Sequence, residues 1–145
     1  KQILYVDMDN VLVDFNSGIE SLSPEDKIKY KGRYDECPDI FSLMVPLNGA
    51  VEAYEQLSKK YDTYILSTSP WNNPSAGKDK LLWVKKYLGK AAYKRLILSH
   101  HKNLNIGDYL IDDRTANGAG MFNGEHIHFK TDRFKNWDDV LNYLL

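Results

Sequence analysis

The strongest constraint on the fold is a short apolar run near the start of the chain that ends in acidic residues. Residues Ile3 to Val6 have the composition of a buried strand, and Asp7 and Asp9 come directly after it. A carboxylate at the end of such a strand lies at the carboxyl edge of a sheet, where open α/β folds bind their ligands. Neighbouring carboxylates repel each other unless a cation or a shared proton offsets their charge. Clustered carboxylate oxygens suit Mg²⁺, so the run indicates a metal site, although Asp-x-Asp also occurs in ordinary surface turns.

Strand-like and helix-like segments alternate along most of the chain. Strands separated by helices imply βαβ units and a mainly parallel sheet, so we expect an α/β fold. The apolar runs and helical spacings predict strands at residues 3–6, 62–66, 95–98, 109–111 and 126–129, and helices at residues 49–60, 78–88 and 137–144.

Residues 15–48 interrupt this alternation. Ser23 followed by Pro24 and Asp26 is typical of a helix N-cap with proline in the first turn. We interpret the segment as a small helical cap over the carboxyl edge of the first strand, where it would exclude water from a site. The alternative is a long crossover made of an ordinary helix and a loop. The predicted organisation is a core of residues 1–14 and 49–145 with a cap of residues 15–48.

Composition narrows the classes of partner. A chain of 145 residues forms one domain, and its net charge of −1 gives no electrostatic reason to bind nucleic acid or an anionic membrane. No apolar run approaches the ~18 residues of a membrane span. Cys37 is the only cysteine, which leaves no intrachain disulfide and fits a reducing cytoplasm. We therefore expect a cytoplasmic protein without nucleic-acid or membrane partners, and a homodimer remains open.

Polar clusters also lie at the ends of three later predicted strands. Thr68 and Ser69 come after the second, Lys102 comes after the third, and the fourth ends in Asp112 and Asp113. Hydroxyls and a lysine at strand ends can hold phosphate oxygens, although each is also common in solvated loops. Two strand ends that both deliver paired acids would destabilise the sheet edge unless a metal is shared between them. Together the clusters favour a phosphate-handling metal site.

This ordered set closely resembles the motifs of the haloacid dehalogenase superfamily of phosphohydrolases over nearly the whole chain. Asp-Met-Asp-Asn-Val-Leu (7–12) resembles the first motif, although Asn10 stands where many relatives have glycine. Within the superfamily the chain is most similar to the 5′(3′)-deoxyribonucleotidases, in residues 7–15, 67–71, 80–89 and 107–114. The resemblance implies a Rossmann-like three-layer core with a small helical cap inserted after the first strand.

The resemblance also implies a mechanism. Asp7 would be the nucleophile that accepts the phosphoryl group, and Asp9 the general acid and then the general base. Mg²⁺ would bind Asp7, the backbone carbonyl of Asp9 and the acid pair, with Asp113 as the direct ligand and Asp112 behind it. The groups expected to hold the transferring phosphoryl are Thr68, Ser69 and Lys102.

The resemblance implies a deoxyribonucleoside monophosphate as the small phosphomonoester substrate. Trp71 is the best candidate for a wall of the nucleoside site, and the predicted cap adds Phe41 and Met44, which could equally pack the cap onto the core. Lys80 and Arg114 could contact sugar or phosphate, or could be surface charges. The alternative functions are a phosphatase for another small metabolite, a phosphomutase, and a non-catalytic phosphate- or metal-binding module on the same fold.

Overall fold

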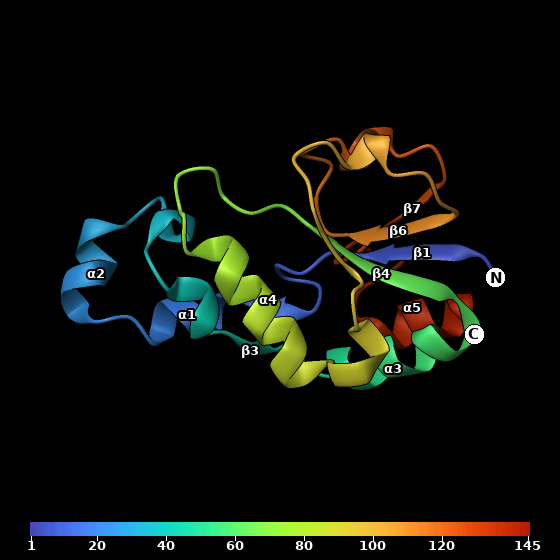
Figure 1. The fold of residues 1–145 in the computed structure, drawn as a ribbon, viewed down its shortest axis with the longest axis horizontal. Helices are drawn as coiled ribbons and strands as arrows, with labels where there is room; N and C mark the ends of the chain where they lie inside the picture. Colours follow the sequence, from blue (N-terminus) through green and yellow to red (C-terminus); the bar gives the residue numbers. More distant parts are fainter.

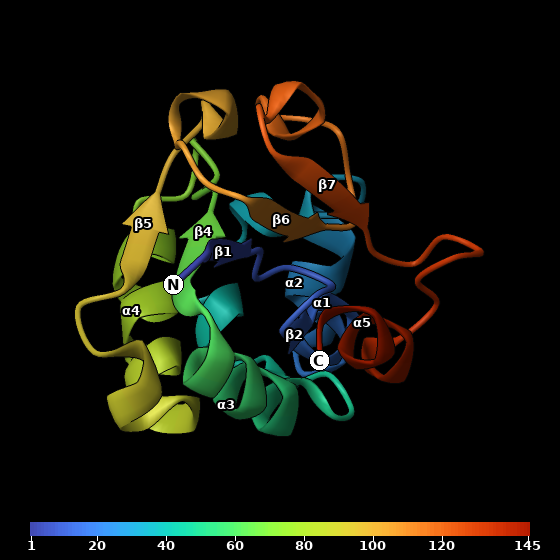
Figure 2. The same ribbon diagram turned by 90° about the vertical axis from the view of Figure 1, so that its right-hand side faces the viewer.

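A five-stranded parallel sheet forms the centre of the molecule. The structure, a computed structural model, describes all 145 residues. The strands lie in the order β5-β4-β1-β6-β7, and Figure 2 shows them side by side. Every neighbouring pair is parallel, which confirms the predicted α/β sheet. The strands are β1 (Ile3–Val6), β4 (Asp62–Ser67), β5 (Leu96–Leu98), β6 (Tyr109–Asp112) and β7 (Glu125–His128).

Three helices cover one face of the sheet and lie below it or to its left in Figures 1 and 2. They are α3 (Ala50–Lys60), α4 (Ala76–Tyr87) and α5 (Trp137–Leu144). The predicted ranges match closely, except that α4 begins at Ala76 rather than at residue 78. Gly89, just after α4, has φ of 56°, a conformation that ends a helix and suits glycine. No helix in the structure has the length and apolar character needed to cross a lipid bilayer.

The two faces of the sheet are covered unequally. Leu4 and Val6 of β1 pack into the larger core with the helices, whereas Tyr5 between them packs with Leu110 and Phe122 on the other face. That second face is covered by loops and by the short 3₁₀ turn η5 (Ala119–Met121) rather than by long helices. The third layer of the expected three-layer core is therefore thin.

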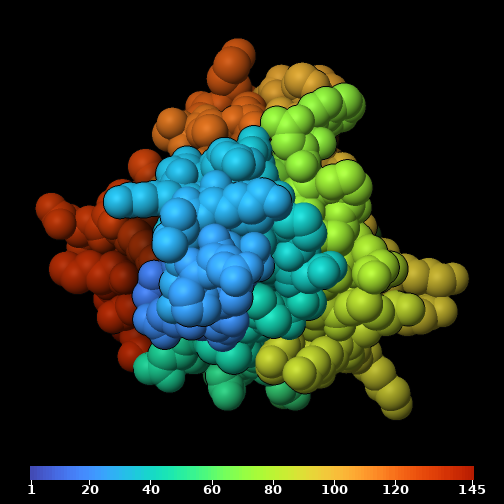
Figure 3. Space-filling model, turned by 90° about the vertical axis from the view of Figure 1, so that its left-hand side faces the viewer, coloured from blue at the N-terminus to red at the C-terminus, as the bar shows by residue number.

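Residues 15–48 form a separate cluster of short elements at the end of the molecule opposite the N-terminus of β1 (Figure 1). Figure 3 shows this segment, in blue to cyan, covering that end beside the green residues that come after β4. The predicted Ser23 cap is confirmed, because Ser23 Oγ accepts a hydrogen bond from Asp26 N at 3.2 Å. The segment contains α1 (Phe15–Glu20), α2 (Pro24–Lys29) and the 3₁₀ turns η1 (Tyr34–Glu36) and η2 (Ile40–Ser42).

The contacts that attach this segment to the rest of the molecule include a strand pair and a hydrogen bond from α4. A two-stranded antiparallel ribbon of β2 (Val13–Asp14) and β3 (Val45–Pro46) joins its two ends. Trp83 of α4 donates its indole N–H to Met44 O at 3.1 Å, so the apolar side of α4 packs beneath the segment. The remaining short turns are η3 (Gly89–Ala92) and η4 (Lys102–Leu104).

Candidate active site

The strand register brings the predicted motifs to one edge of the sheet. Val6 pairs with Ile65 on β4 and with Ile111 on β6, so the residues just beyond these strands emerge together. Asp7 N donates to Ile111 O at 2.9 Å, which continues the β1–β6 ladder by one residue. Asp7 and Asp112 therefore lie next to each other because neighbouring parallel strands end at the same level.

The turn after Asp7 explains the departure at position 10. Leu12 N and Val13 N both donate to Met8 O, at 2.8 and 2.9 Å, and fold the chain back tightly. Asn10 adopts φ of 60° in this turn, a left-handed conformation that glycine and asparagine tolerate and β-branched residues avoid. Asparagine at this position thus preserves the backbone path that glycine would give.

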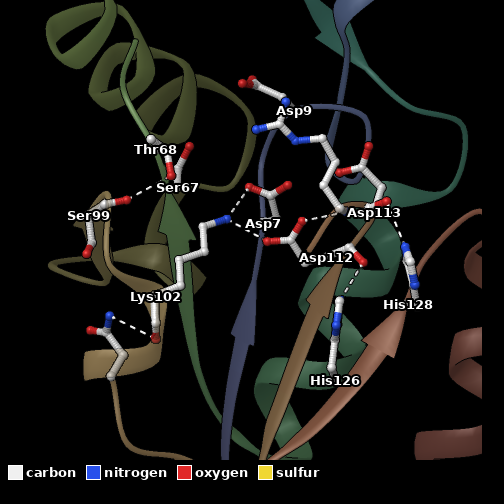
Figure 4. A network of polar contacts seen from close by, with 12 residues as sticks. Asp7, Asp9, Ser67, Thr68, Ser99, Lys102, Asp112, Asp113, His126 and His128 are labelled. Atoms are coloured by element: carbon white, nitrogen blue, oxygen red, sulfur yellow. Dashed lines mark hydrogen bonds and ion pairs between the residues drawn. The ribbon is translucent and has the colours of Figure 1, made fainter. Parts of the chain in front are cut away.

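Lys102 bridges the two strand ends that carry the acids. Its Nζ donates to Asp7 Oδ1 at 2.9 Å and to Asp112 Oδ2 at 2.6 Å, as Figure 4 shows. Burial lowers the pKa of the Lys102 ammonium, but Asp7 and Asp112 outweigh that effect and raise the pKa above its usual value. Lys102 is therefore a permanent cation at the floor of the site.

The loop that carries Lys102 requires glycine at a neighbouring position. Lys102 N donates to Asn117 O at 2.8 Å, and the next residue, Gly118, has φ of 82°. A Cβ on Gly118 would lie 2.9 Å from Lys102 N and would overlap Asn103 Oδ1. Glycine thus allows the backbone after the acid pair to pack directly against the lysine loop.

Three carboxylates form a group suited to a divalent cation. Ligand oxygens of Asp7, Asp112 and Asp113 all lie within 4.8 Å of one another. Burial and the neighbouring Asp7 raise the pKa of both Asp112 and Asp113. Lys102 already neutralises Asp112, whereas Asp113 has no ion-pair partner in the structure. The donor set of hard oxygens and the excess negative charge fit Mg²⁺. Asp113 is the carboxylate of the three whose charge no protein cation offsets.

Two histidines on β7 form hydrogen bonds with the backbone carbonyls of the acid pair, Asp112 and Asp113. His126 Nε2 contacts Asp112 O and His128 Nε2 contacts Asp113 O, each at 3.0 Å, and the two rings stack (Figure 4). A carbonyl only accepts, so each ring must carry its proton on Nε2. Burial lowers the pKa of His126, which keeps that ring neutral. Nothing in the sequence singled out these two residues.

Asp9 stands apart from this group and has a different cationic partner. Figure 4 shows it turned away from Asp7 and Lys102. Its Oδ2 accepts from Lys80 Nζ at 3.3 Å, while its buried Oδ1 has no hydrogen-bond partner. Burial raises the pKa of Asp9, although Lys80 opposes that shift. A carboxyl with a raised pKa at the wall of a cavity can hold a proton and release it to a bound molecule.

A cavity of about 710 Å³ opens above these groups. Its floor includes Asp7 and Lys102, and its walls carry aromatic residues from several segments. Trp71 is 86% exposed at the rim, with its ring 5.8 Å from the ring of His100 in an edge-to-face arrangement. Of the predicted site residues, the cavity is lined by Asp7, Asp9, Thr68, Trp71, Lys102, Asp112, Asp113 and Arg114. The aromatic lining residues that sequence reasoning did not assign to the site are Phe15, Tyr34 and His100.

The family comparison agrees with this geometry. Residues 18–145 match the family model described as 5′ nucleotidase, deoxy (pyrimidine), cytosolic type C protein. The chain belongs to this deoxyribonucleotidase family. A protein of Vibrio phage KVP40 that carries a provisional 5′(3′)-deoxyribonucleotidase name is 66% identical over 144 residues, which span 99% of this chain and 85% of that protein. The 5′(3′)-deoxyribonucleotidase of Bacillus subtilis is 27% identical over 181 aligned positions, which span 100% of this chain and 99% of that protein.

Solved structures agree on the fold. A crystal structure of the HAD-hydrolase YfnB of Bacillus subtilis, bound to magnesium, superposes with a TM-score of 0.71 at 12% identity and covers 99% of this chain and 98% of that one. A HAD-superfamily hydrolase of Geobacter sulfurreducens gives a TM-score of 0.55 at 12% identity, with 99% of this chain and 96% of that chain covered. The family match and the deoxyribonucleotidase relatives confirm the predicted superfamily and the prediction of a phosphoric monoester hydrolase.

Four predicted site residues of this deoxyribonucleotidase-family chain lie away from the cavity surface. Phe41 and Met44 point from residues 15–48 into the main hydrophobic core and do not line the cavity. Ser69 Oγ is buried without a partner and faces Gly77 of α4. The Ser69 hydroxyl therefore points away from the cavity that Thr68 lines. Lys80 was expected to contact substrate or solvent, and the structure instead buries it completely behind Asp9.

Proposed function

We propose that this protein is a Mg²⁺-dependent phosphomonoesterase that hydrolyses deoxyribonucleoside monophosphates through an aspartyl-phosphate on Asp7. The observation that carries the proposal is the position of the Asp7 carboxylate. It lies at the floor of a substrate-sized cavity, 2.9 Å from the buried Lys102 ammonium, and Asp9 lines the same cavity. Family membership supports the same reaction class.

The arrangement gives each of the chain's own residues a chemical role. Asp7 attacks phosphorus in line with the leaving oxygen, and Lys102 offsets the charge on the transferring oxygens. Asp9 gives a proton to the leaving alcohol, then removes one from the water that hydrolyses the aspartyl-phosphate. The Thr68 hydroxyl donates to Ser99 O at 2.8 Å, which fixes its oxygen at the cavity wall beside the phosphoryl site. Such a transfer needs mostly positioning and charge neutralisation.

The proposed metal ligands are Asp7, the backbone carbonyl of Asp9, and Asp113, with Asp112 held back by Lys102. Bound there, Mg²⁺ would neutralise the phosphoryl oxygens and the carboxylates that face them. Support comes from the spacing of the three carboxylates, within 4.8 Å, and from the absence of any other cation at Asp113. The magnesium seen in the YfnB structure is consistent with the assignment.

Substrate choice is assigned to the aromatic rim. Trp71 and His100 would face the base on one side of the cavity, with Phe15 and Tyr34 on the other. We assign residues 15–48 as a cap that forms this second side. A 2′-hydroxyl against an apolar wall would lose its hydrogen bonds to water, so deoxyribonucleotides should be preferred by roughly ten- to a hundredfold in kcat/KM.

The test is a phosphate-release screen over deoxy- and ribonucleoside monophosphates and sugar phosphates with Mg²⁺. We expect the highest kcat/KM on deoxyribonucleotides, and Asp7→Asn should abolish turnover without unfolding the protein, because an amide cannot form an acyl phosphate. Asp132→Asn, at an exposed aspartate, is the matched control. Trapping with beryllium fluoride should place the adduct on Asp7. Residual turnover in Asp7→Asn would refute the nucleophile, and a preference for sugar phosphates would favour the alternative of a metabolite phosphatase.

A further inference from the structure

Lys80 of α4 is a buried cation in an unusual position. Its side chain is 0% exposed, and its Nζ donates to Ser67 Oγ at 2.7 Å and to Thr68 O at 2.8 Å. The remaining interaction is the 3.3 Å ion pair with Asp9 Oδ2. The Lys80 side chain thus extends from α4 through the core, and its ammonium group contacts Asp9, the proposed general acid.

The surroundings of Lys80 hold its ammonium group in one place. The Phe41 ring lies over Nζ at 4.7 Å from the ring centroid and closes off the side facing residues 15–48. Asp9 is the only carboxylate within ion-pair distance. A buried ammonium is costly unless it is paired, so the fold strongly favours the Asp9 orientation that keeps this pair.

We infer that Lys80 is a positioning residue that fixes the Asp9 carboxyl through Oδ2 at the cavity wall, where the carboxyl can give its proton to the leaving group of the substrate. The geometry fits this role because Lys80 is the only side chain that bonds to the Asp9 carboxyl, and Asp9 lines the cavity. Oδ2 is held by Lys80 at 3.3 Å, and Oδ1 is buried without a hydrogen-bond partner. The inference rests on the proposed function and assigns a role to a residue that does not touch the substrate.

The proton transfer involves one proton and two bonds to phosphorus. The proton on the Asp9 carboxyl moves to the leaving oxygen while the bond from that oxygen to phosphorus breaks and the bond from Asp7 to phosphorus forms. Asp9 is left as a carboxylate, and Lys80 stabilises it through Oδ2. Lys80 therefore holds the donor in place before the transfer and stabilises its conjugate base afterwards.

The test compares phenyl phosphate with p-nitrophenyl phosphate, two esters of nearly the same shape. Nitrophenolate is a stable anion and leaves without a proton, whereas phenolate benefits more from protonation as it leaves. In Lys80→Met, kcat/KM should fall at least about tenfold more on phenyl phosphate than on p-nitrophenyl phosphate, since general acid catalysis contributes about 10²–10⁴-fold. The ratio kcat/KM reports only the steps up to phosphoryl transfer from the ester to Asp7. It is therefore unaffected by the later role of Asp9 as the base that activates water.

Two further variants separate a positioning role of Lys80 from a general loss of folding. Ser67→Ala removes one anchor of Lys80 without leaving a buried charge unpaired, and should produce the same leaving-group dependence with a smaller amplitude, even if Lys80→Met is poorly folded. Lys85→Met, at an exposed lysine of the same helix, should change neither rate. Equal losses on both esters in Lys80→Met and Ser67→Ala would overturn the inference and leave Lys80 as a structural residue.

Failure of the proposed function would look different. If the wild-type protein released no phosphate from either ester or from any nucleotide, the phosphatase proposal itself would be wrong and the role of Lys80 would fall with it. A wild-type protein that turns over both esters, with variants that lose both rates in parallel, refutes only the positioning role.

Discussion

Trp71 and His100 come from loops after different strands and meet only at the cavity rim. Their edge-to-face contact at 5.8 Å leaves the Trp71 ring largely exposed, an uncommon state for so large an apolar side chain. Stacking of a base on an aromatic ring contributes about 1–3 kcal/mol. We expect Trp71→Ala to lower kcat/KM on deoxyribonucleoside monophosphates by about tenfold or more and to change p-nitrophenyl phosphate turnover much less.

The control for this prediction is Tyr93→Ala, which removes an exposed aromatic ring that does not line the cavity. It should affect neither substrate. Steady-state kinetics on the two substrates check the result. Parallel losses on both would mean that Trp71 supports the loop after β4 and does not contact the nucleoside.

At the residue scale, the site residues at strand ends could be predicted from the sequence. Asp7, Lys102 and the acid pair were predicted because the carboxyl ends of parallel strands converge, and the register places them as expected. Lys80 could not be assigned in this way. It lies in the middle of a helix, and its partner Asp9 is 71 positions away, so only the packing of α4 against the sheet brings them together.

At the scale of elements, the loop after β4 is tied to residues 15–48 by one buried side chain. Asn73 is 2% exposed, and its Nδ2 donates to Asp35 O at 2.9 Å and to Cys37 O at 3.0 Å. Its Oδ1 accepts from Ser75 Oγ, which in turn accepts from Asp39 N at 2.9 Å. These bonds fix η1, and with it Tyr34, against the cavity.

Asn73→Ala should therefore loosen residues 15–48, the proposed cap, and not the phosphoryl site. The carbonyls of Asp35 and Cys37 would lose their donor, and leaving the buried Cys37 carbonyl unpaired would cost about 1–3 kcal/mol in the free energy of unfolding. We expect a raised KM for nucleotides with nearly unchanged kcat/KM on p-nitrophenyl phosphate, measured alongside a thermal melt. Asn72→Ala removes only an exposed 3.2 Å bond to Glu36 and is the matched control. A nucleotide KM that stays at the wild-type value in Asn73→Ala would contradict a cap that shapes the nucleoside site.

Element boundaries show where sequence patterns lose precision. The strand predicted at residues 126–129 is β7 at Glu125–His128, because the register with β6 pairs Tyr109 with Glu125. The short turns of residues 15–48 could be predicted only as a helical cap. Their positions depend on contacts such as Trp83 to Met44 O, which no local periodicity encodes.

At the scale of the whole molecule, the acid cluster lowers the stability of the metal-free protein. Burial and the neighbouring Asp7 raise the pKa of Asp112 and Asp113, so the folded protein binds protons more tightly than the unfolded chain does. The stability of the metal-free protein should therefore fall as the pH rises from about 4, the pKa of a free aspartate, through the raised values. The proposed Mg²⁺ site thus destabilises the fold that carries it when no metal is bound.

Mg²⁺ should reverse this loss, and most strongly at high pH, where the carboxylates are ionised. At a concentration of 100 times its dissociation constant it would add about 2.7 kcal/mol, or roughly 5–10 °C in Tm for a chain of this size. Asp113→Asn removes one of the repelling charges, so this variant should melt higher than the wild type at pH 8 without metal and should gain little from Mg²⁺. Asp138→Asn, at an exposed aspartate, should keep the wild-type response. Thermal melts at pH 5 and pH 8, with Mg²⁺ or with EDTA, measure this without reference to activity. A wild-type Tm that Mg²⁺ leaves unchanged at pH 8, or an Asp113→Asn variant that still responds fully, would show that the cation binds elsewhere.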